Sequence, residues 1–322
     1  MKIRYTTYPT AFTTPGGGEM QIMKTLSAVQ ACGVDCELLD IYKPILRQDF
    51  DLLHLFSVCY SIELFVNWAE AVGMPFAVSP ILWPTQYEEQ ERNRIRHILL
   101  RASLILPNSV AEKNKIIELL NIPDNGQFFV VPNGFETNIY SNIERNLETI
   151  QNNKVLCIAN IDQRKNLDRL AEACENLNLF LVLAGAIRDL DYFNKLITKF
   201  PKVIEYHGSF ENGSKQHLKL LQEARLFALP SYYETPGIAA IEAGSAGVPV
   251  LVTEVGAAPE YFGDHATYCN PLSLDSIIIG LNFILNKQPV LSRSSRDHYQ
   301  AFSWKKSAKA TVAAYQQVLN QN

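Results

Sequence analysis

The amino-acid sequence predicts an α/β protein with two Rossmann-like, doubly wound domains that face a cleft. Short apolar segments alternate with amphipathic segments along its 322 residues, the pattern breaks at a polar stretch, 142–153, and it then restarts. Such alternation is typical of parallel sheets covered by helices on both faces. Ligands of these folds bind beyond the carboxyl ends of the strands, so we expect the functional site in the cleft.

The first half of the chain begins with a strand and a glycine-rich loop, "TTPGGGE". A helix over 19–32 follows, because Met20, Met23, Leu26 and Val29 recur at helical spacing. Further strands are predicted at 34–40, 51–57, 75–79, 103–107 and 127–132, and further helices at 88–102 and 109–122. These elements form a predicted first domain, 1–150.

The second half repeats the pattern from "KVLCIAN" onward. Strands are predicted at 154–160, 179–185, 202–208, 225–231 and 248–253, with helices at 166–177, 189–200, 214–224 and 237–247 between them. These elements form a predicted second domain, 151–302, and a last segment, 303–322, forms a further helix.

Composition argues against a nucleic-acid-binding, secreted or membrane-spanning protein. A net charge of −4 gives no general reason to expect nucleic acid as a partner. The start of the chain lacks the apolar core of a signal peptide, and the longest apolar run, 179–187, is too short to span a bilayer. The six cysteines show no metal-binding spacing, and apolar neighbours indicate that Cys59, Cys157 and Cys174 are buried. We expect a cytoplasmic protein.

Three glycines, Gly16, Gly17 and Gly18, lie between the first strand and the first helix. Glycine allows the backbone to approach a ligand without a Cβ atom in the way. The alternative is a flexible turn. The spacing does not fit the dinucleotide-binding pattern, which separates its glycines more widely.

Two cations, Arg164 and Lys165, follow the first strand of the second domain. Cations at the carboxyl end of a strand can bind phosphate. The alternative is a solvated loop that ends at a helix cap, Asn166.

The stretch "YYETPGIAAIEAGSAGVPV" places Glu234 before a predicted helix and Glu242 within it. The helix N-terminus near Gly237 attracts anions. Carboxylates accept hydrogen bonds from neighbouring hydroxyls. A nucleotide diphosphate sugar offers hydroxyls on both sides of an anion, so one acid could bind the ribose and the other the hexose. The alternative is an unrelated pair of acids on a loop and a helix.

These segments resemble the retaining glycosyltransferases of family 4, which have the GT-B fold and a glutamate-x7-glutamate signature. The resembling segments follow one another in the family's order and cover most of the chain: "PGGGE", "VVPNGFETNIY", "IANIDQRKNLDRL", the signature itself, "GVPVLVTEVGAAPEYF" and "FSWKKSAKATVAAYQQVL". The resemblance implies that the last helix, within 303–322, packs back on the first domain.

The resemblance also implies roles for individual residues. Glu242 would bind the ribose, Glu234 the donor sugar, and Lys165 the leaving diphosphate. Gly17 and Gly18 would approach the phosphates or the acceptor. The helix terminus under the diphosphate would be formed by Pro236, Gly237, Ile238 and Ala239. No metal or other cofactor is implied, because lysine and the helix terminus take that place.

Two departures from the family pattern concern catalysis. Many members have an arginine where this chain has Asn160, and Arg164 could supply that charge. Many also have a histidine after a middle strand of the first domain, where this chain has Ser79 and Pro80. His54 lies after another strand position, either on the acceptor side with Ser79 or as a core histidine.

The predicted function is metal-independent transfer of a hexose, with retention, from a nucleotide diphosphate sugar. UDP-glucose is the first choice of donor and GDP-mannose the second. The acceptor would be a glycan or a lipid-linked glycan in polysaccharide synthesis. Arginines on the helix 88–102 could contact the inner face of a membrane, although acids at its start favour an ordinary surface helix.

Other functions remain open at this point. A metal-dependent transferase would use Asp49 and Asp51 or Asp189 and Asp191, but Asp189 and Asp191 lie at a helix start, where acids are expected. A non-catalytic sugar-nucleotide-binding relic of the same fold would explain Asn160 and the missing histidine. An epimerase or phosphorylase would need different residues in the cleft.

Overall fold

The computed structural model describes residues 1–13, 16–83, 87–141, 143–145, 150, 153–287 and 293–320. The chain forms two compact units: Met1–Gly134 with Phe302–Asn322, and Phe135–Ala301. The described residues of 135–150, a segment that the sequence assigns to the first domain, therefore lie in the second unit. Most of the expected linker, 142–153, lies outside the described residues.

Unit 1 contains a five-stranded parallel sheet with the order β2-β1-β3-β4-β5. Its strands are β1 (Lys2–Thr6), β2 (Asp35–Leu38), β3 (Leu52–Phe56), β4 (Phe76–Ser79) and β5 (Leu104–Ile105). The expected strand over 127–132 is not a full strand, since it is reduced to an isolated bridge between Ile105 and Phe128. Pro107 and Pro132, which lack an N–H group, follow the paired residues on the two segments.

Helices cover both faces of this sheet and bury two separate apolar clusters. One cluster packs around Leu53, Leu55 and Val78, and the other around Ile3, Tyr5 and Phe56. Alternate residues of one strand therefore point to opposite faces, as the pleat of a sheet requires. The helices are α1 (Gly17–Gln30), α2 (Glu63–Ala71), α3 (Glu89–Arg101), α4 (Val110–Leu120) and α13 (Trp304–Leu319).

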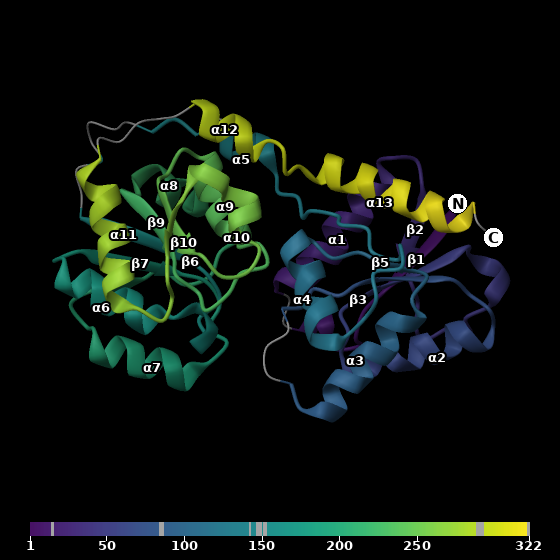
Figure 1. Ribbon diagram of the computed structural model, residues 1–322. Helices are drawn as coiled ribbons and strands as arrows, with labels where there is room; N and C mark the ends of the chain where they lie inside the picture. Colours follow the sequence, from purple (N-terminus) through teal and green to yellow (C-terminus); the bar gives the residue numbers. More distant parts are fainter. Residues whose placement is uncertain are drawn as a thin grey trace. The chain divides into compact units, whose positions relative to one another are not determined.

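The last helix, α13, lies alongside α1 on unit 1 (Figure 1), as the sequence predicts. Its Tyr315 hydroxyl forms hydrogen bonds with the Tyr5 hydroxyl at 2.8 Å and with His54 Nδ1 at 2.6 Å. His54 Nε2 continues the chain of contacts to Ser79 Oγ at 2.9 Å. All four side chains are buried. This network ties the end of the chain to β1, β3 and β4.

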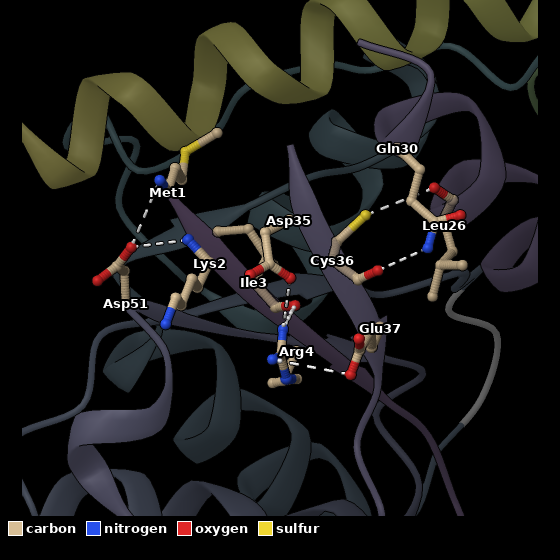
Figure 2. A network of polar contacts seen from close by, with 10 residues as sticks. All are labelled: Met1, Lys2, Ile3, Arg4, Leu26, Gln30, Asp35, Cys36, Glu37 and Asp51. Carbon is tan, nitrogen blue, oxygen red and sulfur yellow. Dashed lines mark hydrogen bonds and ion pairs between the residues drawn. The ribbon is translucent and has the colours of Figure 1, made fainter. Parts of the chain in front are cut away.

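The first strand is also fixed by polar contacts near its start (Figure 2). The Arg4 guanidinium lies 3.4 Å from Asp35 and 3.8 Å from Glu37, both on β2. The Lys2 amide donates a 2.7 Å hydrogen bond to the Asp51 carboxylate, just before β3. Exposed pairs of this kind contribute little free energy. Their positions agree with the parallel register of β1 with both neighbours.

Unit 2 contains a six-stranded parallel sheet with the order β11-β10-β9-β6-β7-β8. Its strands are β6 (Lys154–Ile158), β7 (Phe180–Ala184), β8 (Ile204–Tyr206), β9 (Leu226–Leu229), β10 (Val250–Thr253) and β11 (Thr267–Cys269). The chain builds outward from β6 to β8 and then returns to place β9 on the other side of β6. The strand order therefore reverses between β6 and β9.

The helices of unit 2 include four that the sequence does not predict. These are α5 (Thr137–Ser141), α10 (Ala258–Phe262), α11 (Leu274–Asn286) and α12 (Arg293–Tyr299). The predicted helices are α6 (Leu167–Asn176), α7 (Leu190–Lys199), α8 (Lys215–Glu223) and α9 (Ile238–Ser245). No helix in the described ranges combines the length and apolar character needed to cross a bilayer.

The cysteines are all free among the described residues. Cys157 and Cys174 are buried as expected, and burial raises the pKa of Cys157 to about 12. The expectation is wrong for Cys59, which is partly exposed because it lies in the turn after β3 rather than inside the sheet.

The arginines of α3 mostly bind within the protein. Arg94 donates to the carbonyl of Val58 at 2.7 Å and pairs with Glu91, and Arg101 lies 2.9 Å from Glu70. Arg96 contacts the carbonyl of Asn121 at 3.4 Å. These contacts fit the ordinary surface helix that the acids at its start indicate, and membrane contact stays a prediction.

We expect Tyr315→Phe to destabilise unit 1 by about 1–3 kcal/mol, because the change leaves Tyr5 and His54 with an unpaired polar atom in the core. All three tryptophans, Trp68, Trp83 and Trp304, belong to unit 1. Urea unfolding followed by tryptophan fluorescence therefore reports this unit. Tyr42→Phe is the matched control, since Tyr42 is 92% exposed and should show no change. Equal effects of the two variants would contradict the proposed anchoring.

Candidate active site

The candidate site lies at the carboxyl ends of β6 and β9, where the strand order of unit 2 reverses. A reversal of this kind opens a crevice beyond the strand ends, and ligands of doubly wound sheets bind there. Lys165 follows β6 and Glu234 follows β9. Topology thus brings together two residues that lie 69 positions apart in sequence.

Lys165 and Glu234 form a buried ion pair. Lys165 ends the short 3₁₀ turn η4 (Gln163–Lys165), and its Nζ donates to Glu234 Oε1 at 2.6 Å. The exposed fractions of the two residues are 8% and 5%. Arg164 lies farther from the same oxygen, at 3.7 Å, and its guanidinium packs over the Tyr233 ring at 5.3 Å. The two cations predicted for this loop therefore differ, because only Lys165 is buried.

Opposing effects set the charge of Glu234. Burial by itself raises the pKa of this carboxyl. The charges of Lys165 and Arg164, together with the hydrogen bond from Lys165, outweigh burial and leave the pKa below its ordinary value of 4.5. Glu234 is therefore ionised at neutral pH and can accept hydrogen bonds from hydroxyl groups.

The backbone of Glu234 is held by the loop that follows β10. The Glu234 amide donates to the Val255 carbonyl at 3.2 Å, and the Ala257 amide donates to the Glu234 carbonyl at 2.8 Å. Gly256 lies between them with a φ of 101°, and a Cβ atom there would come within 2.2 Å of the Glu234 carbonyl oxygen. Only glycine fits this position. In the sequence, the signal for this close contact is the glycine itself, which lies in the loop between a strand and a helix.

The N-terminus of α9 lies where the sequence predicts an anion-binding element. Gly237 caps the helix with a φ of 85°, after a cis peptide bond between Thr235 and Pro236. In the described residues, the amides of Ile238 and Ala239 make no hydrogen bond. Unpaired amides and the helix dipole at this end favour a negatively charged ligand.

Glu242 is the fifth residue of α9 and is buried, with an exposed fraction of 4%. The Tyr140 hydroxyl, on α5, donates to Glu242 Oε1 at 2.9 Å. His217 on α8 places Nε2 3.9 Å from the other oxygen, Oε2. The sequence does not predict either contact, because Tyr140 lies 102 positions from Glu242 and the His217 contact depends on how α8 packs beside α9.

The two asparagines beside Lys165 differ in their surroundings. Asn160 lies two residues after β6, and no side-chain hydrogen bond is found for it among the described residues. Asn166 occupies the expected cap position of α6, but its side chain does not cap the helix. Its amide instead donates to the carbonyls of Pro230 at 3.0 Å and Pro271 at 2.8 Å. Asn166 thereby ties the Lys165 turn to the segment after β9.

The remaining candidate residues belong to unit 1. Gly17 and Gly18 form the first turn of α1 rather than a loop, since the helix begins at Gly17. His54 and Ser79 are buried in the hydrogen-bonded network with Tyr315. Burial lowers the pKa of His54 to about 3, so the ring is neutral. His54 is thus a core histidine here, and an acceptor-side role for His54 and Ser79 stays a prediction.

One residue of each acidic pair that a metal-dependent enzyme would use, Asp189 and Asp51, has a structural partner. Asp189 caps α7, with its side chain accepting from the Tyr192 amide at 2.9 Å, which confirms the expected role at a helix start. Asp51 accepts from the Lys2 amide. In the part of the chain that the structure describes, no group of three or more His, Cys, Asp or Glu residues could hold a metal ion.

The second unit matches a family model. Residues 141–301, half of the chain, match the model described as "Glycosyl transferases group 1". The chain therefore belongs to the group 1 glycosyl transferases.

Curated relatives agree with this family. An uncharacterized glycosyltransferase of Methanocaldococcus jannaschii is 28% identical over 66% of this chain and 59% of its own length. An MMP alpha-(1->4)-mannosyltransferase of Mycolicibacterium hassiacum is 27% identical over 60% of this chain and 49% of its own length. The chain thus matches about half of the length of these relatives.

The fold is shared with solved glycosyltransferase structures. Sucrose-phosphate synthase from Thermosynechococcus elongatus superposes with a TM-score of 0.82 at 16% identity, covering 100% of both chains. HepE of Anabaena, in complex with UDP and glucose, gives 0.79 at 17% identity, covering 98% of this chain and 100% of the other. The predicted two-domain α/β fold is confirmed.

We expect Lys165→Met to lower the free energy of unfolding of unit 2 by about 3–5 kcal/mol at pH 7, because it leaves the Glu234 carboxylate buried without its partner. The double variant Lys165→Met with Glu234→Met should recover most of this loss. Circular dichroism during urea unfolding measures both.

The loss should also depend on pH. Since the pKa of Glu234 lies below 4.5 in the folded protein, its stabilising contribution is present above that pH and disappears as the pH falls through the folded pKa. The difference between wild type and Lys165→Met should therefore shrink below pH 4.5. A difference that stays constant down to pH 3 would contradict the ion pair.

We expect Gly256→Ala to destabilise unit 2 by about 3 kcal/mol, because the methyl group meets the Glu234 carbonyl at a positive φ. Gly208→Ala is the matched control in the same unit. Gly208 has a φ of 72° and open space where a Cβ atom would lie, so it should show only backbone strain of about 1 kcal/mol. Equal losses in thermal unfolding would show that the contact with Glu234 is unimportant.

Proposed function

We propose that this chain transfers a hexose from a nucleotide diphosphate sugar to an acceptor hydroxyl, with retention at the anomeric carbon. The observation that carries the proposal is the Lys165–Glu234 pair at the reversal point of the unit 2 sheet, 2.6 Å apart and buried. The proposal places the chain among the family 4 retaining enzymes that its signature resembles.

The donor would extend from Glu242, at its ribose, to Glu234, at its hexose. The unpaired amides of Ile238 and Ala239 supply hydrogen bonds to the diphosphate. Glu242 accepts hydrogen bonds from the ribose hydroxyls, and Glu234 accepts them from the hexose hydroxyls. Glu234 is buried just before α9 and Glu242 is buried within it, so both carboxylates are shielded from water when they bind the sugar.

Lys165 has two partners in this scheme. In the free protein its charge is balanced by Glu234. A diphosphate at the start of α9 would share that charge, and Lys165 would then stabilise the negative charge that develops on the leaving group. Arg164, more exposed and 3.7 Å from Glu234, could add a second cation.

The reaction proposed here occurs on one face of the sugar. The bond between the anomeric carbon and the phosphate oxygen breaks, the acceptor oxygen bonds to the same face, and the acceptor proton passes to the leaving phosphate oxygen. No protein nucleophile and no metal take part in this scheme. Lys165 and the α9 amides stabilise the diphosphate, and Glu234 orients the hexose.

UDP-glucose is the first choice of donor and GDP-mannose the second. The HepE structure of Anabaena contains UDP and glucose, which supports the first. Mannosyltransferases among the relatives, such as that of Mycolicibacterium hassiacum, support the second. We propose a glycan or lipid-linked glycan as the acceptor, in polysaccharide synthesis, with cytoplasmic activity at or near the inner face of a membrane.

We expect Lys165→Ala to reduce hexose transfer on the order of a hundredfold or more, because it removes a charge aligned with the leaving group. Release of nucleoside diphosphate from UDP-glucose and GDP-mannose, with a mixed glycan acceptor extract and excess chelator, measures this. Lys199→Ala is the matched control, since Lys199 is an exposed lysine of the same unit paired with Glu172.

Three outcomes would count against the proposal. Near-normal transfer by Lys165→Ala would remove the role of Lys165. Transfer abolished by chelator would favour a metal-dependent enzyme. Donor binding by the wild type, seen as a raised melting temperature, with neither transfer nor hydrolysis would favour the non-catalytic relic.

A further inference from the structure

We propose that Tyr140 and His217 are positioning residues that orient the Glu242 carboxylate for the ribose of the nucleotide. This inference rests on the proposed function, in which Glu242 binds the ribose hydroxyls. It adds two residues, on α5 and α8, that act through Glu242.

Tyr140 fixes one oxygen of the carboxylate. Its hydroxyl donates to Glu242 Oε1 at 2.9 Å, and both residues are buried. Burial and the neighbouring Glu242 charge raise the pKa of Tyr140, so the hydroxyl keeps its proton and remains a donor. A hydrogen bond from a neutral hydroxyl to an ionised carboxylate is stronger than one between two neutral groups.

His217 faces the other carboxylate oxygen, Oε2, with its Nε2–H group. Its Nδ1 accepts a 3.0 Å hydrogen bond from the Gly213 amide, so the proton of the neutral ring lies on Nε2. Burial lowers the pKa of His217 to about 4, which keeps the ring neutral. Nε2 lies 3.9 Å from Glu242 Oε2 and has no hydrogen-bond partner in the described residues.

The surroundings of His217 leave its ring little freedom. The ring is fully buried, stacks on Phe210 at 5.3 Å and meets the Tyr140 ring edge-on at 5.5 Å. A buried donor without an acceptor is rare and calls for a function. A small movement of Glu242 on binding a ligand would bring Oε2 within hydrogen-bond distance of Nε2.

Together the two donors restrict Glu242 to one orientation. An ionised carboxylate has about four acceptor positions. Tyr140 takes one and His217 is aimed at another. A carboxylate fixed in this way discriminates ribose from deoxyribose better than a freely rotating one, because less conformational freedom is lost on binding.

The test compares UDP and GDP with their 2′-deoxy counterparts by calorimetry. We expect the wild type to bind one ribonucleotide about tenfold more tightly than its deoxy form. Tyr140→Phe, which removes only the hydroxyl, should weaken binding of the ribonucleotide and leave the deoxynucleotide nearly unchanged, so that the ratio falls to about threefold or less.

Tyr192→Phe is the matched control. Tyr192 also donates to a carboxylate of unit 2, Asp168 Oδ1, at 2.9 Å, and it makes no contact with Glu242. Tyr192→Phe also loses the 3.0 Å hydrogen bond that the Tyr192 hydroxyl accepts from the Asp168 amide, so it removes at least as many contacts as Tyr140→Phe. A purely structural effect would lower both melting temperatures and leave both affinity ratios at the wild-type value.

Two variants of His217 separate its donor from its acceptor. His217→Asn can keep the acceptor for Gly213 but lacks the distant N–H group, so it should lower the affinity ratio. His217→Gln can place an amide N–H group near the position of Nε2 and should retain the ratio. Identical ratios in both variants would overturn the role of His217.

The possible results distinguish a failure of this inference from a failure of the proposed function. Wild type that binds neither UDP nor GDP overturns both. Wild type that binds but does not prefer the ribonucleotide overturns the role of Glu242 and its two neighbours, while donor binding stands. A wild-type ratio kept by Tyr140→Phe overturns only the positioning role of Tyr140.

Discussion

The site of unit 2 depends on the buried ion pair between Lys165 and Glu234. Burying two charges is costly, and an apolar pair of similar volume is often as stable or more so. Stability alone therefore does not explain a lysine and a glutamate that are each more than nine-tenths buried. The proposed function, in which the donor needs both a cation and a carboxylate at one point, would explain them. The pair keeps each charge compensated in the free protein.

The rest of unit 2 holds this pair in place through its backbone. The reversal of strand order between β6 and β9 brings the two residues to neighbouring strand ends. Asn166 ties the lysine turn to the segments after β9 and β11, and Gly256 allows the loop after β10 to pair with Glu234. The positions of the Lys165 and Glu234 side chains are therefore set by contacts made by other residues and by the backbone.

Much of this arrangement could be predicted from the sequence. The contacts that could not be predicted share a physical reason. The strands around Lys165 and Glu234 were predictable because short apolar runs with helical segments between them define parallel sheets. The helix start at Gly237 was predictable from its turn residues. The contacts of Tyr140, His217 and Gly256 were not, because they join elements distant in sequence and depend on tertiary packing. The core position of His54 also required the structure, since its partner Tyr315 lies 261 residues away.

Two buried, neutral histidines, His54 and His217, differ in their hydrogen bonding. Both ring nitrogens of His54 have partners, at 2.6 Å and 2.9 Å, so that ring completes a core network that joins α13 to the sheet. His217 has a partner on one nitrogen only, and its second nitrogen points at a carboxylate 3.9 Å away. A satisfied buried group contributes to stability, whereas an unsatisfied one costs free energy until a partner arrives. The unpaired amides of Ile238 and Ala239 lie in the first turn of α9, and the unpaired nitrogen of His217 lies beside the same helix, as the proposed oxygen-rich ligand would require.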